Sequence, residues 1–401
     1  YSGDFRAYVY KSEDFGESWI DITSGLPESS VNVIVEHPDQ INLLFLGNEV
    51  GIFVSLDGGD HWERLMNGLP TVPVDDIKIH LENNDLVIGT HGRGIWILDN
   101  ITPLIELAGP DNWPIDDPYL FQTGLAIQWK TANVQEWTGS AEFRLPNPTN
   151  DARIRYWIPE NFKGSSDLEF KILTTTGQQI RSFSQKMTPG AHEVLWDYRI
   201  DPAFTSDSPG SGNNRFRGGP RPQGPMVLPG IYQIQMELGQ VTMFGDVMVR
   251  LDPRIEISNS ELQDRQEALM SIYRLQKPVF DANQAIARLQ EQMEEATHLI
   301  DTSSEGEEVL GQEAKKIIDT LDDIQNNLRS LPMGVGGSIE GSTTLPTQDQ
   351  LQDIDIAWEE GPRIIEHLNS LISTTIPQFY ESMNTAGIRA DPGQIIRIPG
   401  K

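Results

Sequence analysis

The residues from Ser12 to Trp19 read SEDFGESW, and 43 residues later the residues from Ser55 to Trp62 read SLDGGDHW. Both copies keep a Ser, an Asp, a Gly and a Trp at the same spacing, and a Gly-Leu-Pro follows each copy in the same register. The shared positions are Ser12, Asp14, Gly16 and Trp19, and then Ser55, Asp57, Gly59 and Trp62. A repeat of this length with short alternating strands predicts four-stranded sheets, as in the blades of a β-propeller.

The repeated residues also predict a local structure. We expect the Asp to accept backbone N–H bonds across a tight turn between two strands, the Gly to adopt a positive φ, and the Trp to pack between neighbouring blades. A third, partial copy at 89–99 lacks the closing Gly and Trp. Because propellers need roughly four to eight blades, we expect residues 1–102 to be the last blades of a propeller whose other blades lie outside this chain.

The pattern then changes to a second kind of β structure. Residues 103–140 predict a connector that contains several prolines, and residues 141–254 contain short alternating strands that predict an immunoglobulin-like β-sandwich. A loop rich in Gly, Pro and Ser spans residues 201–228 of that sandwich. We interpret the loop either as a surface insertion or as a basic arm that docks on an acidic surface. Its basic residues are Arg215, Arg217 and Arg221.

The last part of the chain, residues 255–401, has apolar residues at helical spacing. Ser260 predicts a capping box at the start of the first helix, and Pro278 predicts a break or a kink in it near Gln276. The Gly-rich stretch 333–344 predicts a loop. Since short connections favour antiparallel neighbours, we expect a C-terminal antiparallel helical bundle or hairpin. The predicted fold class is therefore multidomain, mainly β and then α.

The net charge and the composition exclude several classes of function. The 401 residues include 59 Asp and Glu against 30 Lys and Arg, which gives a formal net charge of −29. Such a charge repels phosphate backbones and anionic lipids, so we expect no nucleic-acid partner. The chain has no cysteine, which excludes disulfides, thiol nucleophiles and Cys-ligated metal sites. No apolar run reaches the roughly 18–20 residues of a membrane span.

The order of these features resembles one family. Repeated Ser-Asp-Gly-Trp motifs followed by a sandwich and a helical tail are similar to the C-terminal half of bacterial sortilin-type proteins with Asp-box (BNR) repeats, which are often labelled glycosyl hydrolases. The resemblance implies a periplasmic, outer-membrane-associated or extracellular location in a Gram-negative bacterium. It implies other envelope proteins, the rest of its own propeller or a glycan as partners. Further markers are Thr90–Trp96, Trp196 with Asp197, Pro229–Tyr232 and Leu251–Arg254.

The hydrolase label can be weighed against the residues present. A glycosidase needs two carboxylates about 5–9.5 Å apart that flank the scissile bond. Asp75 and Asp76 follow a Pro-rich turn, where we expect a loop facing a channel, but one adjacent pair cannot face a substrate from both sides. His91 and Arg93 are further candidates for ligand binding at a channel mouth. Their structural interpretation is that His91 caps a strand turn and Arg93 bridges two blades. The sequence therefore assigns no catalytic residue.

Metal and cofactor motifs are weak as well. Asp57 and Asp60 have oxygen ligands that suit calcium, so incidental calcium is the one ion we name, and we expect no cofactor and no dedicated metal site. Two functions remain. The chain is either a non-catalytic binding or assembly protein of the cell envelope, or a polysaccharide-active glycoside hydrolase whose cleft lies mainly in blades outside it. The first is favoured because no visible pair of residues supplies an acid and a base.

Overall fold

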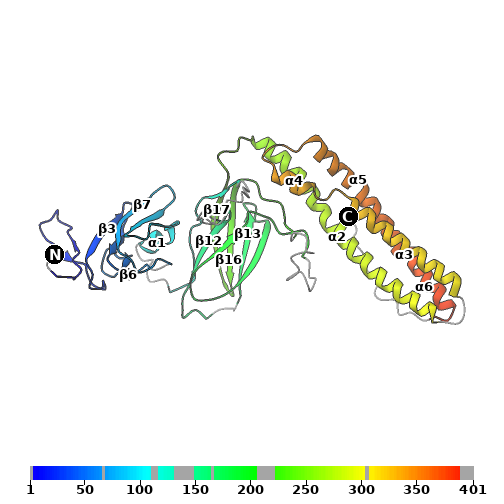
Figure 1. The fold of residues 1–401 in the computed structure, drawn as a ribbon, viewed down its shortest axis with the longest axis horizontal. Coiled ribbons are helices and arrows are strands. Elements are labelled where there is room, and N and C mark those ends of the chain that lie inside the picture. Colours follow the sequence, from blue (N-terminus) through cyan, green and yellow to red (C-terminus); the bar gives the residue numbers. More distant parts are fainter. Residues whose placement is uncertain are drawn as a thin grey trace. The chain divides into compact units, whose positions relative to one another are not determined.

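The computed structural model has several β-sheets in the N-terminal part and a set of long helices in the C-terminal part (Figure 1). The predicted order, β followed by α in a multidomain chain, is confirmed. The structure describes residues 3–65, 68–109, 116–130, 149–163, 167–205, 222–302 and 307–388. It divides into two compact units, Tyr1–Asp197 with Pro229–Leu251, and Tyr198–Leu228 with Asp252–Lys401. The finer division at residues 102, 140 and 254 stays a prediction.

The repeated motifs lie in the first three sheets of the first unit. Each sheet is antiparallel with its strands in chain order, and the sheets have two, four and three strands. The strands are β1 (Tyr10–Lys11) and β2 (Ile20–Asp21); β3 (Val31–His37), β4 (Gln40–Asn48), β5 (Gly51–Ser55) and β6 (Glu63–Arg64); and β7 (Val74–His80), β8 (Asp85–Thr90) and β9 (Ile95–Leu98). By the 43-residue period, β1 and β2 correspond to β5 and β6, and β7 to β9 correspond to β3 to β5.

Apolar side chains fill the spaces between consecutive sheets of this set. Successive residues of a strand point to opposite faces, so β4 and β5 bury side chains on both sides. On one side, Leu44, Leu46, Phe53 and Trp62 pack with Val9 and Ile22 of the first repeat. On the other side, Leu43, Phe45, Ile52 and Val54 pack with Ile77, Leu86 and Ile88 of the third repeat. The middle sheet is therefore a fully covered member of a stack.

The third sheet ends differently from the second. The residues 43 positions after β6 are Glu106 and Leu107, and they lie in the helix α1 (Thr102–Leu107) instead of a fourth strand. Pro103 occupies the first turn of α1, where its missing N–H costs nothing. The sheet formed by β7, β8 and β9 consequently has no fourth strand in the described part of the chain.

The remaining strands of the first unit form two sheets that face each other. Alternate residues of β12 are buried, and rings from the two sheets meet at 5.2 Å between Tyr156 and Phe170 and at 5.5 Å between Trp196 and Tyr232. This arrangement has the two layers expected of a sandwich, and the immunoglobulin-like assignment stays a prediction. One sheet has the order β10 (Tyr119–Leu120), β12 (Ala152–Ile158), β15 (Gly190–Trp196); the other has β11 (Ala126–Gln128), β17 (Val241–Leu251), β16 (Gly230–Leu238), β13 (Asp167–Thr174), β14 (Gln179–Lys186).

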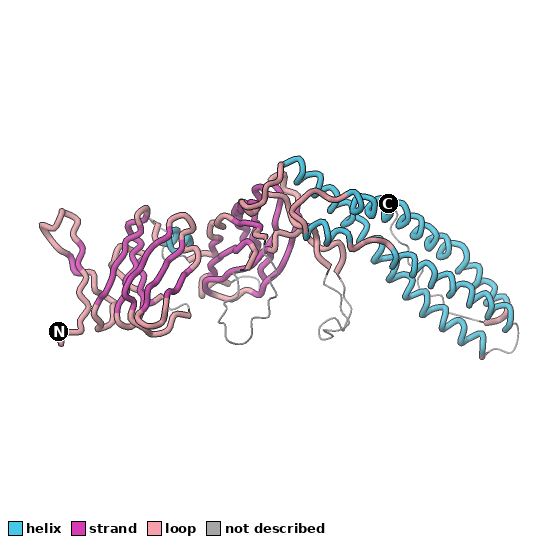
Figure 2. The backbone as a smooth tube through the Cα atoms, turned by 45° about the horizontal axis from the view of Figure 1, so that its top comes forward, coloured by secondary structure: helices cyan, strands magenta, loops and turns pink. Residues whose placement is uncertain are grey.

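The second unit is helical, as Figure 2 shows in cyan. Helices α2, α3, α5 and α6 share one long apolar core, to which Ile286, Ile317, Leu368 and Phe379 contribute. The helix α3 follows α2 after a short connection and lies beside it in both views. The elements are α2 (Asn259–Asp301), α3 (Glu307–Ser330), α4 (Val335–Gly341), α5 (Gln348–Ser370), the π-helical turn η1 (Leu371–Thr375) and α6 (Ile376–Thr385).

Three sequence predictions for the helices were wrong. The capping box of α2 is formed by Ser258 and Glu261 instead of Ser260. Pro278 does not break α2, which continues through it, because packing against neighbouring helices stabilises a helix more than propensity does; the alternative, a kink, stays a prediction. The Gly-rich stretch contains α4, whose Val335 and Ile339 are buried. In both of the last cases tertiary packing outweighed the local signal of Pro or Gly.

Candidate functional site

The two repeated motifs adopt the same hydrogen-bonded turn. In the first, the Ser12 hydroxyl donates to Asp14 Oδ1 (2.9 Å), and Oδ1 also accepts the N–H of Ser18 (2.8 Å). In the second, Ser55 donates to Asp57 Oδ1 (2.8 Å), which accepts the N–H of His61 (2.9 Å). The Ser oxygen in turn accepts the N–H of the third shared residue, Gly16 or Gly59, at 2.7 and 2.8 Å. These contacts match the predicted local role of Ser and Asp.

The glycine of each turn has the positive φ that the sequence predicts, +92° at Gly16 and +102° at Gly59. The tryptophans differ from each other. Trp62 is 6% exposed, and its indole N–H donates to the carbonyl of Ile22 at 2.7 Å. Trp19 at the equivalent position is 63% exposed. The expected packing between sheets is therefore seen for Trp62 and not for Trp19.

The electrostatics of both turns favour an ionised carboxylate. Hydrogen bonds from the Ser18 hydroxyl and N–H lower the pKa of Asp14 to about 2. Partial burial raises the pKa of Asp57, but hydrogen bonds from the N–H and ring of His61 outweigh it, and the net pKa is lowered. The same bond, His61 Nδ1 to Asp57 Oδ2 at 2.7 Å, raises the pKa of His61. Both aspartates thus act as turn-forming acceptors.

The residues that the structure describes contain no assembled set of metal ligands. No group of three or more His, Asp or Glu side chains there is placed to hold an ion. The Asp57 oxygens that we considered for calcium accept hydrogen bonds from Ser55 and His61. Asp57 and Asp60 therefore belong to no such group among the described residues.

Two of the candidate ligand-binding residues lie together. His91 Nδ1 is 3.2 Å from Asp75 Oδ2, and both side chains are exposed. The His91 N–H donates to the Pro73 carbonyl (2.9 Å), so the turn between β8 and β9 is joined to the start of β7. Gly92 and Gly94, both with positive φ, shape this turn. A small polar surface results, with one imidazole and one carboxylate.

The other two candidates contribute less to that surface. Asp75 and Asp76 lie on β7 and not in a loop as predicted, because the strand begins at Val74. The Asp76 carboxylate accepts a hydrogen bond from the N–H of Ile77 (2.9 Å) and lies 3.4 Å from Lys78 Nζ. Arg93 is exposed at the tip of the turn, and its carbonyl accepts the indole N–H of Trp96 (3.1 Å). The arrangement can bind a polar group, and among the described residues the hydrogen-bonding partner of the Asp75 carboxylate is an imidazole, not a second carboxylate.

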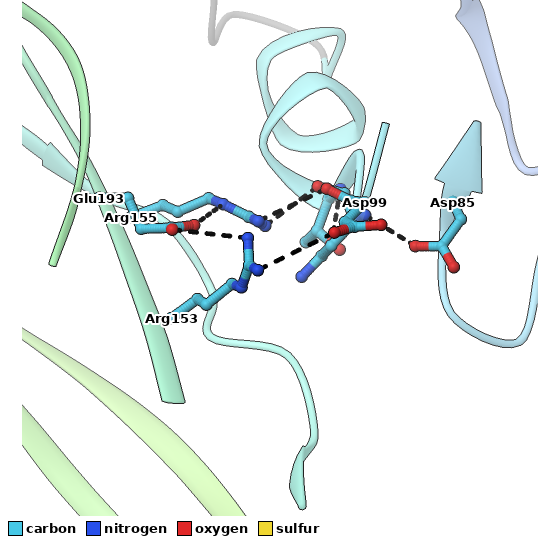
Figure 3. Close-up of polar contacts among 7 residues, drawn as sticks. Asp85, Asp99, Arg153, Arg155 and Glu193 are labelled. Carbon is cyan, nitrogen blue, oxygen red and sulfur yellow. Dashed lines mark hydrogen bonds and ion pairs between the residues drawn. The ribbon is translucent and has the colours of Figure 1, made fainter. Parts of the chain in front are cut away.

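A polar junction that the sequence did not reveal is drawn in Figure 3. We use this name for the contacts among Asp85, Asp99, Arg153, Arg155 and Glu193. The Arg155 guanidinium donates to Glu193 Oε2 (2.9 Å) and to the carbonyls of Asn100 (3.1 Å) and Asp99 (3.4 Å). Asn100 has a φ of +54°, and its N–H donates to Asp85 Oδ1 (2.9 Å). The junction joins the turn after β9 to the sheet that contains β12 and β15.

The described ends of the 201–228 loop pack within the helical unit. Arg199 and Glu340 form a largely buried ion pair at 2.7 Å. Glu340 also accepts the N–H of Met226 (2.9 Å), and the ring of Phe204 stacks on Phe280 at 4.0 Å. Arg215, Arg217 and Arg221 lie outside the described residues. The flanks of the loop are therefore structural parts of the second unit.

Comparison with solved structures gives a weak likeness. No protein-family model and no curated protein sequence matches the chain. A solved extracellular domain of a one-component system from B. thetaiotaomicron is similar at a TM-score of 0.18 and 11% identity, over 63% of this chain and 34% of that one. The chain thus spans about a third of the length of that structure. In the part of the chain that the structure describes, no helix is both long and apolar enough to cross a membrane.

Proposed function

We propose that this chain is a non-catalytic binding and assembly protein of the bacterial cell envelope, of the sortilin-type repeat class that its sequence resembles. The polar residues that stand out in the sequence support this proposal. Asp14 and Asp57 accept hydrogen bonds that shape turns, and Arg155 joins two sheets. The remaining candidate pair, His91 with Asp75, is an exposed imidazole and carboxylate, whereas glycosidases use two carboxylates.

The observation that carries the proposal is the exposure of large apolar side chains on sheet faces. On the five-stranded sheet, Ile231 of β16 lies directly opposite Met248 of β17, and both point to solvent. Phe244, on the same face of β17, is also exposed. The first and third repeat sheets expose apolar residues as well. Because contiguous exposed apolar patches mark interaction sites, these faces are suited to binding proteins.

The envelope location is supported by composition. A net charge of −29 keeps the chain away from nucleic acid and anionic lipid. It also disfavours self-precipitation at high concentration, because like-charged molecules repel. A protein of this charge can present apolar faces to a partner and remain in solution.

The non-catalytic role of His91 and Asp75 is tested by assaying the purified chain for release of reducing ends from xyloglucan and from a soluble β-glucan. We expect no release above the buffer blank. The variants His91→Ala and Asp75→Asn should give the same blank value as the unmodified chain. Release of reducing ends by the unmodified chain that either variant abolishes would instead establish a glycoside hydrolase with His91 and Asp75 in its site.

A further inference from the structure

A cavity of about 650 Å³ lies on the five-stranded sheet, over β13, β14 and the end of β16. Glu169, Glu237, Ser182 and Ser184 are among the residues that line it. Glu169 lies directly opposite Glu237 on one side and opposite Ser184 on the other, so these side chains share one face of the sheet. The next residue of β13, Phe170, is buried in the sandwich core. Because successive residues of a strand point to opposite faces, the cavity belongs to the outer face of the sandwich.

The lining of this cavity is acidic. Its carboxylates are Asp167, Glu169 and Glu237, and none of the described residues that line it has a positive charge. Asp167 lies opposite Lys186 across the strand pair. The ammonium of Lys171 is 2.8 Å from both oxygens of Glu237 but 3.8 Å from Glu169, which is beyond hydrogen-bond length. Glu169, whose side chain is 49% exposed, is therefore the carboxylate best placed to receive a cation from outside.

The cavity is continuous with the exposed apolar residues of the same sheet face. Phe244 of β17 lies opposite Gln235 of β16, and the Gln235 amide donates to the Glu237 carboxylate. Ile231 and Met248 lie opposite each other further along the same two strands. The distance from Ile231 to Glu237 along β16 is roughly 20 Å at about 3.4 Å per residue. A protein interface of standard size, about 800 Å² on each partner, covers such a length.

We infer, on the basis of the binding function proposed above, that this face docks a protein segment with an Arg or Lys side chain beside large apolar side chains. The apolar side chains cover Phe244, and the cationic group enters the cavity and pairs with Glu169. Burial of apolar surface favours the contact, and the carboxylates select a basic partner. A neutral glycan has no cation to place there, and a second copy of this chain carries the same charge of −29.

A random peptide library tests which chemistry this face selects. Dodecapeptides displayed on phage are selected on the immobilised 401-residue chain, and one enriched peptide is synthesised with a fluorescent label. We expect the enriched peptides to combine Arg or Lys with large apolar residues. Fluorescence anisotropy is then measured at about 0.15 M salt, where charges more than about 8 Å apart are largely screened.

Glu169→Gln and Phe244→Asp should each weaken binding of this peptide roughly tenfold or more. Glu63→Gln is the matched control, because Glu63 is an exposed carboxylate on β6 in another sheet, and it should leave binding unchanged. Replacing the basic residue of the peptide by Gln completes a double-mutant cycle with Glu169→Gln. That peptide should bind the unmodified chain roughly tenfold more weakly than the original peptide does, and the two peptides should bind Glu169→Gln almost equally.

Several outcomes would overturn the inference. They are enriched peptides without Arg or Lys, a library that yields no binder, and equal effects of the peptide change on the unmodified chain and on Glu169→Gln. Binding that Phe244→Asp loses and Glu169→Gln keeps would also overturn it, but would leave the proposed binding function intact. Labelled xyloglucan takes the place of the peptide in a last measurement, and we expect no binding. Xyloglucan binding that Glu169→Gln abolishes would assign the cavity to a glycan instead.

Discussion

Asp14 and Asp57 occupy one position of the repeat, and their hydrogen bonds are the same. Their surroundings differ: the hydroxyl that donates to Asp57 belongs to Ser55, which is 1% exposed, whereas Ser12, which donates to Asp14, is half-buried. An unsatisfied donor costs more free energy where water cannot replace the lost partner. The same substitution should therefore cost more stability in the second turn than in the first.

We predict that Asp57→Ala lowers the free energy of unfolding by roughly 1–2 kcal/mol, the cost of losing one or two hydrogen bonds in a partly buried turn. Asp14→Ala serves as the control and should have a clearly smaller effect. Urea denaturation followed by tryptophan fluorescence measures both. Equal losses in the two variants would mean that the burial of Ser55 does not matter for this turn.

His61 gives the second turn a dependence on pH. Its hydrogen bond to Asp57 raises its pKa, so the charged imidazole stabilises the folded state. That contribution is fully present below the unfolded pKa of about 6.5 and is lost as the pH rises through the folded pKa. The first turn has Ser18 at this position, and the Ser18 hydroxyl donates to Asp14 Oδ2 (2.6 Å) without titrating.

We therefore expect His61→Ser to remove this pH dependence while keeping the bond to Asp57. Thermal unfolding of the unmodified chain and of His61→Ser at about pH 5.5 and about pH 8.5 measures the effect. The difference in Tm between the two pH values should be smaller in the variant. If the variant keeps the full pH dependence, the His61 contact does not stabilise the turn.

At the scale of elements, Arg155 is the main link in the polar junction. Its side chain is only 17% exposed and contacts one carboxylate and two carbonyls. We predict that Arg155→Leu lowers the free energy of unfolding by about 2–3 kcal/mol. The charged hydrogen bonds of Arg155 are lost, and Glu193 keeps the longer ion pair with Arg153. Arg153→Leu is the control. Its ion pairs are 3.6 and 3.9 Å long, so its loss should be below about 1 kcal/mol.

Amide hydrogen exchange at Asn100 and Ile101 supplies a local measure of the same link. The N–H groups of these two residues bond to Asp85 and to the Asn84 carbonyl. Arg155→Leu should speed their exchange, since the turn after β9 would lose its anchor to β12. Unchanged exchange together with reduced stability would show that Arg155 supports its own sheet and not the junction.

Glu340 has a comparable place in the helical unit. It receives the Arg199 guanidinium and the N–H of Met226, both from the flanks of the loop between β15 and β16. Glu340→Gln keeps an acceptor for the Met226 N–H and removes the charge, whereas Glu340→Ala removes both. We predict that Met226 exchanges its amide hydrogen faster in the alanine variant than in the glutamine variant. Equal exchange in the two would contradict the role of the Met226 contact.

The sequence predicted elements well where the signal is local. The Ser-Asp turns follow from one residue binding its neighbours, and β12 follows from alternation over Ala152–Ile158. Contacts between distant residues were not predictable. Arg155 meets Asn100, which is 55 positions away, and Arg199 meets Glu340, and nothing in the local pattern marks either pair. Pro278 and the glycines near α4 misled the prediction because burial outweighed propensity.

The candidate site was predictable in part. The 43-residue repeat alone does not predict that His91 lies next to Asp75. Their proximity depends on the register in which β7 and β8 pair. The exposed state of Trp19 could not be read from its motif, which is identical to that of Trp62 at the four shared positions. Exposure depends on the neighbouring sheet, and a motif does not carry that information.

At the scale of the whole molecule, the packing between repeats has one direction. The middle sheet packs Phe53 and Trp62 against the sheet before it and Ile52 and Val54 against the sheet after it. In this account, the surfaces that bind partners are exposed apolar sheet faces, such as the one with Ile231, Phe244 and Met248 on the five-stranded sheet.

Retention of proteins from a bacterial envelope extract on the immobilised chain tests this claim most directly, when the unmodified chain is compared with Phe244→Asp. Phe244 is 58% exposed on the five-stranded sheet, and Ile41→Asp, at a residue that is 71% exposed on another sheet, is the control. We expect the unmodified chain and the Ile41→Asp control to retain the same proteins and Phe244→Asp to lose them. Equal retention by all three chains, or none by any of them, would contradict the account.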